Sequence, residues 1–184
     1  FYVADALEYA KNNGNLIHRD IKPANIMILK SNKKMPKVID FGLAKAVVTA
    51  GNSISSTPNL TASGATMGTL FYMPPEQIGD AKHADHRADI YALGATFYHM
   101  LAGRPPFGEI GATSAVMKAK MQKMPTLPLS QYRPDVPPAV SKIIDTAMAF
   151  AIEKRYPAMA QLKADLKKFI ESLKLFSHLA NMGD

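Results

Sequence analysis

Four polar residues near the start of the chain have the types and spacing that transfer of a phosphoryl group requires. Asp20, Lys22 and Asn25 lie in the string His-Arg-Asp-Ile-Lys-Pro-Ala-Asn at residues 18–25, and Asp40 begins an Asp-Phe-Gly tripeptide. In-line attack on a γ-phosphate needs an oriented acceptor hydroxyl, neutralised phosphate charge and divalent cations held against the phosphate oxygens. Asp20 can accept a hydrogen bond from the hydroxyl, and Lys22 can lie beside the transferred phosphate. Asn25 and Asp40 carry oxygen ligands of the kind that the Mg²⁺ or Mn²⁺ of bound ATP would take.

Two short, largely apolar runs between these residues predict the hairpin that would bring them together. Residues 26–29 and 37–39 are separated by a polar stretch, a pattern typical of two paired strands. Asp20 and Asn25 share one turn of chain before the first run. We therefore expect the hairpin to return Asp40 to the same place.

Apolar residues at helical spacing predict that most of the remaining chain is helical. The expected fold class is α+β, mostly α, with the small hairpin on a helical scaffold. The first helix should end at Asn13-Gly14, and Thr113 or Ser114 should cap a later one. Residues 174–184 lose the periodicity, and we expect a tail or the start of a linker there. The expected helices cover residues 1–13, 90–103 and 113–123 and, after a Pro-rich loop at 125–138, the regions around 140–147 and 162–173.

The composition limits the kind of protein. With 184 residues, 47% of them hydrophobic, the chain can bury the core of one domain. The absence of cysteine excludes disulfides and Cys-ligated metals and fits a reducing, cytoplasmic compartment. No apolar run approaches the roughly 20 residues of a membrane-spanning helix, so membrane anchoring would have to come from other regions of the protein. The net charge of +7 is dispersed along the chain, and nucleic-acid binding is not expected.

Four motifs together resemble the Ser/Thr protein kinases, and most closely their bacterial branch. They are HRDIKPAN, DFGLAK, MGTLFYMPPEQ and DHRADIYALG. The resemblance implies the helical large, C-terminal lobe of a kinase domain over residues 1–173, with an activation segment at 40–76. It also implies an enzyme that transfers the γ-phosphate of Mg-ATP to Ser or Thr hydroxyls of protein substrates.

Two ATP-binding motifs of protein kinases, which belong to the small lobe, are not found before these motifs. No Gly-rich G-x-G-x-x-G loop and no Val-Ala-x-Lys strand stands before His18. We therefore expect a fragment that lacks the small, N-terminal lobe, has that lobe as its partner and is nearly inactive alone. The alternative is a non-catalytic pseudokinase or scaffolding module of kinase fold, against which the presence of Asp20, Asn25 and Asp40 argues.

The resemblance assigns a role to each matching position. Asp20 is implied to be the catalytic base and Lys22 the phosphate-contacting lysine, with Asn25 and Asp40 as metal ligands. Lys22 together with Thr69, which can bridge Asp20 and Lys22, matches the Ser/Thr-specific pattern. Met27 is implied to lie under the adenine ring.

Further matching positions have structural roles. Glu76 is expected to pair with Arg155, and Asp89 is expected to brace the backbone of the His-Arg-Asp motif. The positions implied to be structural are His18, Phe41, Gly42, Glu76, Asp89 and Arg155.

A loop without charged side chains indicates a regulatory switch. Residues 46–75 contain no Asp, Glu, Lys or Arg, and they are rich in Ser and Thr. The loop itself offers no carboxylate to Arg19 and Lys45, whereas a phosphate on it could bind these cations and order it, as the resemblance implies for Arg19. The alternative is that these hydroxyls only solvate a loop. The candidate phosphoacceptors by their spacing from Thr69 are Thr61, Ser63 and Thr66.

Overall fold

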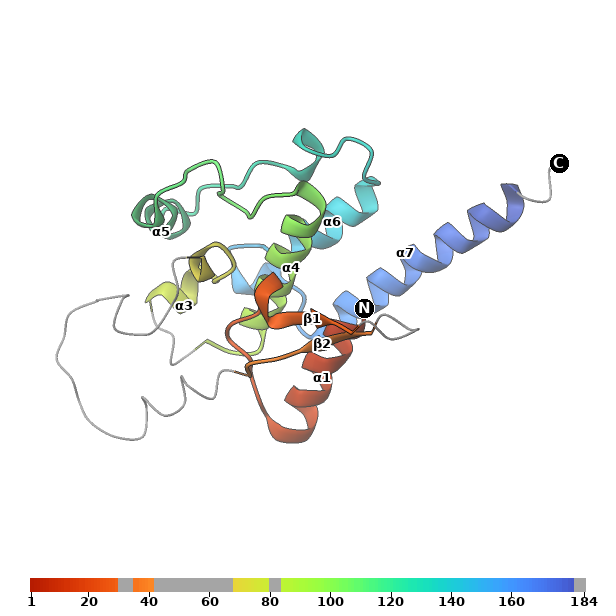
Figure 1. Ribbon diagram of the computed structural model, residues 1–184, viewed down its shortest axis with the longest axis horizontal. Coiled ribbons are helices and arrows are strands. Elements are labelled where there is room, and N and C mark those ends of the chain that lie inside the picture. Colours follow the sequence, from red (N-terminus) through yellow and green to blue (C-terminus); the bar gives the residue numbers. More distant parts are fainter. Residues whose placement is uncertain (30–34, 42–67, 80–83, 181–184) are drawn as a thin grey trace.

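The computed structural model describes residues 1–29, 35–41, 68–79 and 84–180, which form a mostly helical molecule with one two-stranded sheet (Figure 1). The expectation of a mostly α structure with a small hairpin is confirmed. Short 3-10 turns lie at Pro23–Asn25, Thr69–Phe71, Leu129–Gln131 and Ile152–Lys154. In chain order the helices and strands are α1 (Tyr2–Gly14), β1 (Ile26–Ile28), β2 (Pro36–Val38), α3 (Pro75–Gly79), α4 (Arg87–Ala102), α5 (Thr113–Met121), α6 (Pro138–Ala147) and α7 (Met159–Ala180).

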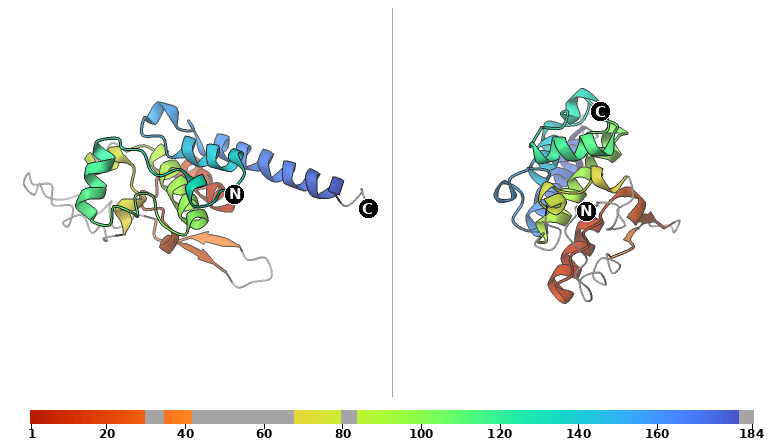
Figure 2. Two further views of the ribbon diagram at one scale, coloured as in Figure 1. Left: turned by 90° about the horizontal axis from the view of Figure 1, so that it is seen from above. Right: turned by 90° about the vertical axis from the view of Figure 1, so that its left-hand side faces the viewer.

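Helix α4 is the core helix of the molecule, as the apolar run from residue 90 predicted. It packs against α6 and α7, and it lies in the middle of the views in Figures 1 and 2. Ile90, Tyr91 and Ala95 are 0% exposed, which is typical of a helix covered by other elements on all faces. The helix ends at Gly103, whose φ of 73° lies in the left-handed region and whose N–H reaches the carbonyl of His99 at 2.9 Å.

The largest core cluster joins the two ends of the chain. Leu7 of α1, Ile90 of α4, Ile143 of α6 and Leu162 of α7 are all buried in it. Beyond this cluster α7 extends away from the body of the molecule (Figure 2). The helix continues to Ala180, which is past the end at residue 173 that the periodicity predicted.

A glycine allows the close approach of α4 and α6. A Cβ atom on Gly94 would lie 2.7 Å from the Cβ of Ala147, a separation at which one of the two helices has to move. The absence of a side chain at this position is therefore required by the packing of the two helices.

The expected hairpin is present, with strands slightly different in extent from the predicted runs. Strands β1 and β2 are antiparallel, and their register pairs Ile26 with Val38 and Ile28 with Pro36. The proline has no N–H to donate, which suits a two-stranded sheet in which each strand is an edge. The hairpin rests on the largest core cluster through Ile26 and Val38.

Helix α1 ends at Gly14, as the Asn13-Gly14 pair predicted, whereas the start of α5 differs from the expectation. The left-handed residue after α1 is Asn15, with φ of 48°, rather than Gly14; the Asn15 side chain accepts a hydrogen bond from Lys11 at 2.7 Å. Helix α5 begins after Ala112 without a side-chain capping bond, so neither Thr113 nor Ser114 caps it. The left-handed Asn15 satisfies the end of α1 through its backbone N–H, which reaches the carbonyl of Lys11 at 3.0 Å.

Within the part of the chain that the structure describes, no helix is both long enough and apolar enough to cross a membrane.

Candidate active site

A buried carboxylate from α4 holds the backbone that carries Asp20. Asp89 is 4% exposed, and its two oxygens accept the backbone N–H groups of His18 and Arg19, each at 2.8 Å. The φ of Arg19 is 63°, a left-handed conformation that costs a non-glycine residue about 1–3 kcal/mol and persists only where neighbours enforce it. Burial raises the pKa of Asp89, whereas the two N–H bonds act in the opposite direction because they stabilise the carboxylate. Helix α4 thus fixes the turn that presents Asp20.

The His18 ring joins this turn to the Asp-Phe-Gly tripeptide after β2. The residue is 0% exposed. Its Nε2 donates to the carbonyl of Ile39 at 2.9 Å, and its Nδ1 accepts the N–H of Asp20 at 3.3 Å. The ring centroid lies 4.7 Å from that of Phe41. These contacts place the residues around Asp40 next to the residues around Asp20.

Asp20, Lys22, Asn25 and Thr69 form one hydrogen-bonded group. The ammonium of Lys22 donates to Asp20 Oδ2 at 3.0 Å and to Thr69 Oγ1 at 2.9 Å. Asn25 Nδ2 donates to the Asp20 carbonyl at 2.8 Å and to Asp20 Oδ2 at 3.2 Å. Lys22 therefore contacts both Asp20 and Thr69. Asp20 has its carboxylate oriented by a cation and an amide, as a group that orients an acceptor hydroxyl requires.

Asp40 is brought beside Asn25 by the hairpin. The N–H of Ile39 donates to the Asn25 carbonyl at 3.0 Å, and Asp40, the next residue, is exposed with a left-handed φ of 57°.

The donor set fits a magnesium ion that also takes nucleotide oxygens. Asn25 uses its amide nitrogen for Asp20, which leaves the type of oxygen that Mg²⁺ prefers, and Asp40 adds a carboxylate. Among the described residues no group of three or more His, Cys, Asp or Glu side chains could hold a metal ion. Asn25 and Asp40 would hold the ion through their side-chain oxygens, and Mg²⁺ usually keeps phosphate and water oxygens as further ligands.

An exposed apolar side chain lies two residues after Asn25 in the chain. Met27 of β1 is 49% exposed, and Ile28, the next residue of the strand, points to the opposite face. An apolar side chain near a group of oxygen ligands suits the flat, largely apolar base of a nucleotide.

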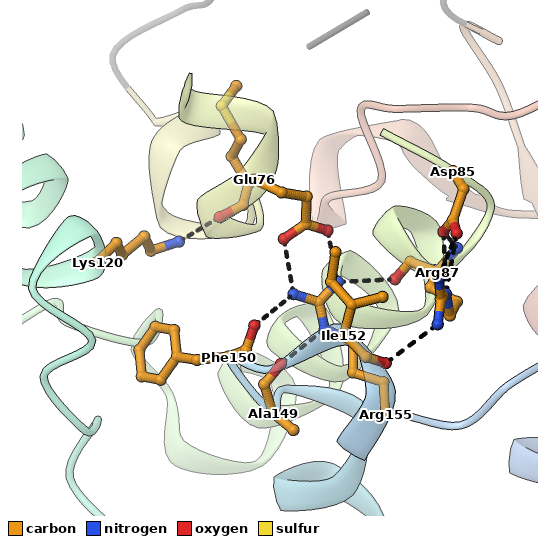
Figure 3. A network of polar contacts seen from close by, with 9 residues as sticks. Glu76, Asp85, Arg87, Lys120, Ala149, Phe150, Ile152 and Arg155 are labelled. Carbon is orange, nitrogen blue, oxygen red and sulfur yellow. Dashed lines mark hydrogen bonds and ion pairs between the residues drawn. The ribbon is translucent and has the colours of Figure 1, made fainter. Parts of the chain in front are cut away.

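Glu76 and Arg155 form a paired contact between α3 and the segment before α7. Arg155 Nη1 and Nη2 donate to the two carboxylate oxygens of Glu76 at 2.6 Å and 2.8 Å (Figure 3). Arg155 is 3% exposed and also donates to the Ala149 carbonyl at 2.6 Å. Its guanidinium lies 5.0 Å from the centroid of the Tyr91 ring. The two-point geometry fixes the orientation of α3, which follows the Thr69 segment in the chain.

Two residues that sequence reasoning missed contact the segment between Thr69 and α3. Lys120 of α5 is 0% exposed and donates to backbone carbonyls of this segment, and His99 of α4 is hydrogen-bonded through Nδ1 to the hydroxyl of Tyr72 at 2.5 Å. The local signal for Lys120 is its spacing: it lies four residues after the apolar Val116, which is buried, so the two share a face of the helix.

Five of the positions named from the sequence lie outside the residues that the structure describes, so their roles stay predictions. They are Gly42, Lys45, Thr61, Ser63 and Thr66.

The geometry around Asp20 agrees with the result of a comparison with known protein families. The family described as the protein kinase domain matches residues 2–172. This chain belongs to the protein kinase family. The match covers every element from α1 through most of α7, and so includes all of the contacts described above.

Bacterial kinases are among the curated proteins that this chain resembles. Serine/threonine-protein kinase PknB of Mycolicibacterium smegmatis is 38% identical over 161 residues, which are 88% of this chain and 24% of that protein. Probable serine/threonine-protein kinase PknB of Corynebacterium glutamicum is 40% identical over 182 residues, 97% of this chain and 26% of that protein. PknB of Mycobacterium tuberculosis H37Rv is 37% identical over 162 residues, 88% of this chain and 24% of that protein. The chain thus spans about a quarter of the length of these relatives.

Proposed function

We propose that the protein is a serine/threonine kinase and that this chain is the large lobe of its catalytic domain. In this proposal the protein transfers the γ-phosphate of Mg-ATP to Ser or Thr hydroxyls of other proteins. The observation that carries the proposal is the group in which Lys22 binds both Asp20 and Thr69 while Asn25 holds the same Asp20 oxygen. The names of the bacterial relatives support the choice of acceptor.

Each residue of the group has a defined task in the transfer. Asp20 accepts a hydrogen bond from the Ser or Thr hydroxyl of the substrate. This bond orients the hydroxyl oxygen toward the phosphorus. Lys22 donates to the transferred phosphoryl oxygens and offsets their charge. Asn25 and Asp40 would hold Mg²⁺, which would offset the negative charge of the phosphate.

In this proposal, other parts of the full-length protein supply the remaining contacts with ATP. The sequence of 184 residues contains neither the Gly-rich loop nor the Val-Ala-x-Lys strand of protein kinases. We therefore assign nucleotide binding to a site that the large lobe completes together with a small lobe, and we expect the separate chain to be nearly inactive.

A phosphate-transfer assay on the full-length protein tests this function. Radiolabel from γ-labelled ATP is followed into a Ser- and Thr-containing protein substrate with Mg²⁺ present. We expect Asp20→Ala to lower the rate by about 10²–10⁴-fold, because the hydroxyl loses its general base. Glu109→Gln, at an exposed residue of the same chain, is the matched control and should retain the wild-type rate.

Two outcomes would contradict the proposal. Equal transfer by the wild-type protein and Asp20→Ala would remove Asp20 from the reaction. An absence of transfer from a folded, ATP-treated wild-type protein would favour the alternative, a non-catalytic scaffold of kinase fold.

A further inference from the structure

Lys120 is a lysine whose side chain lies inside the protein. The residue is 0% exposed, and its ammonium donates to the carbonyls of Leu70, Phe71 and Met73 at 2.7, 2.9 and 2.7 Å. An ammonium has three N–H donors, so all of them are used on one short stretch of backbone. Figure 3 shows the Lys120 side chain reaching from α5 toward the segment that leads into α3.

The surroundings of Lys120 impose a large desolvation cost on its ammonium group. Within the described ranges its contacts are carbonyl oxygens and aromatic rings rather than a carboxylate, with Nζ 5.3 Å from the Tyr91 centroid and 5.4 Å from that of Phe107. Burial lowers the pKa of Lys120 well below 10.5, and the negative charge of Glu76 on α3 acts in the opposite direction. A methionine or leucine would fill the same space without this desolvation cost. What only the lysine supplies is the attachment of the three carbonyls to α5.

The backbone that Lys120 holds, residues 70–73, follows directly after Thr69, which belongs to the hydrogen-bonded group around Asp20. Leu70 directly follows Thr69, whose Oγ1 accepts from Lys22, and Lys22 in turn binds Asp20. Further along, the N–H groups of Tyr72 and Met73 both donate to the Thr69 carbonyl, at 3.1 and 3.2 Å. A displacement of this stretch would therefore move Thr69 relative to the Lys22–Asp20 pair.

A third attachment fixes the same stretch from α4. The hydroxyl of Tyr72 lies 2.5 Å from Nδ1 of His99, and the two rings are stacked with centroids 5.9 Å apart. Burial lowers the pKa of His99, which favours the neutral ring in this hydrogen bond. Three side chains thus hold residues 69–73: Lys22, from the turn that carries Asp20, His99 of α4 and Lys120 of α5.

We propose that Lys120 is a positioning residue for phosphoryl transfer, which holds residues 69–73 on α5 so that Thr69 stays against the Lys22–Asp20 pair. The proposal rests on the function proposed above. Because Asp20 orients the acceptor hydroxyl, the loss of this attachment affects the use of the acceptor more than the binding of the nucleotide.

The kinetic test uses the full-length protein and a Ser/Thr peptide that the wild type phosphorylates. Lys120→Met removes the donors and keeps the length of the side chain. We expect it to lower kcat/KM for the peptide by about 10²-fold, the usual effect of a reacting group misplaced by about 1 Å, with the Kd for Mg-ADP unchanged. Lys118→Met, at an exposed lysine of the same helix, is the control and should keep wild-type values for both.

Hydrogen exchange tests the attachment without relying on activity. In Lys120→Met the amides of Tyr72 and Met73 should exchange faster than in the wild type, while amides in the middle of α4 keep their protection. If the wild type transfers no phosphate, the proposed function fails, and this exchange measurement still decides whether Lys120 holds the segment.

Three results would overturn the inference. They are wild-type peptide kinetics in Lys120→Met, unchanged exchange at Tyr72 and Met73, and equal loss of peptide use and Mg-ADP binding, which would indicate general damage to the fold. If Lys120→Met does not fold, Lys120→Gln, which keeps two N–H donors, is compared in the same assays. Recovery of peptide use by Lys120→Gln relative to a Lys120→Leu variant supports the positioning role, and identical behaviour of the two variants rejects it.

Discussion

Two residues of the candidate active site have left-handed backbone conformations, which residues other than glycine rarely adopt. Arg19 and Asp40 have φ values of 63° and 57°. Each is held by a specific polar contact nearby: Asp89 binds the N–H of Arg19 at 2.8 Å, and His18 binds the carbonyl just before Asp40 at 2.9 Å. Strain of this kind gathers at functional sites, where the surroundings fix the residue and aim its side chain.

The buried lysine gives the stability of the protein a defined pH dependence. Burial lowers the pKa of Lys120 in the folded state below its unfolded value of 10.5. Between these two values the unfolded chain binds more protons than the folded one, so stability increases with pH in this window. Below the folded pKa both states carry the charge, and its desolvation cost is fully present. Tyr91 of α4 and Glu76 of α3 face the same ammonium, and burial raises the pKa of Tyr91, so it stays neutral there.

We predict that the wild type gains stability relative to Lys120→Met as the pH rises toward 10.5. The slope of the difference in the free energy of unfolding should approach about 1.4 kcal/mol per pH unit within the window. Urea denaturation of both full-length proteins at a series of alkaline pH values measures it, with Lys118→Met as the control for removing a lysine from α5. A difference that is constant over the series would show that Lys120 keeps its proton in the folded protein.

The packing of α4 on α6 depends on a single missing side chain. A Cβ on Gly94 would lie only 2.7 Å from the Cβ of Ala147, which is too short a separation for two methyl groups. Since α4 also carries Asp89, and its N–H partners lie in the catalytic turn, a shift of α4 would reach the active site. Helix α4 therefore links its contact with α6 to the geometry of the turn that carries Asp20.

We predict that Gly94→Ala destabilises the protein by about 1–3 kcal/mol because the helices must separate. This loss exceeds the gain of about 1 kcal/mol that alanine brings to a helix interior. Gly68→Ala is the control, since a Cβ there meets nothing within 4 Å. Calorimetric melting of the two variants compares them, and a Gly94→Ala protein that melts at or above the wild-type temperature would contradict the described helix contact.

Long-range polar contacts hold distant segments of the molecule together. Glu76 and Arg155 are 79 positions apart in the chain, yet they form two hydrogen bonds. Lys163 of α7 contacts both Asp5 and Glu8 of α1. The first pair is largely enclosed and the second is at the surface, so the first should contribute more to the integrity of the fold.

We predict that Arg155→Met lowers the free energy of unfolding by about 3 kcal/mol, because it leaves the Glu76 carboxylate and several carbonyls without their donor. Lys167→Met, which removes an exposed lysine paired with Glu171 at 3.8 Å, is the control and should have little effect, as surface pairs usually do. Chemical denaturation of the full-length variants distinguishes them. Equal losses would mean that the enclosure of Arg155 contributes nothing.

Local spacing in the sequence was enough to predict the elements and the chemical groups. The residues that form one turn, such as Asp20, Lys22 and Asn25, are neighbours in the chain, so their proximity needs no tertiary information. The hairpin and the central helix were predictable for the same reason, because the alternation and periodicity of apolar residues are local properties. The family resemblance added the pairing of Glu76 with Arg155, which spacing alone does not reveal.

Tertiary structure decided which side chains enter the interior and how backbone ends are satisfied. Lys120 is a surface residue by its type, and only the packing of α5 over the segment from Leu70 to Met73 makes it a buried donor. Gly94 had no local signature of a helix contact, and Asn15 takes the left-handed position beside a glycine. The physical reason is common to all of them: burial, close approach and backbone satisfaction depend on atoms far away in the chain, whereas periodicity and motif spacing depend only on neighbours.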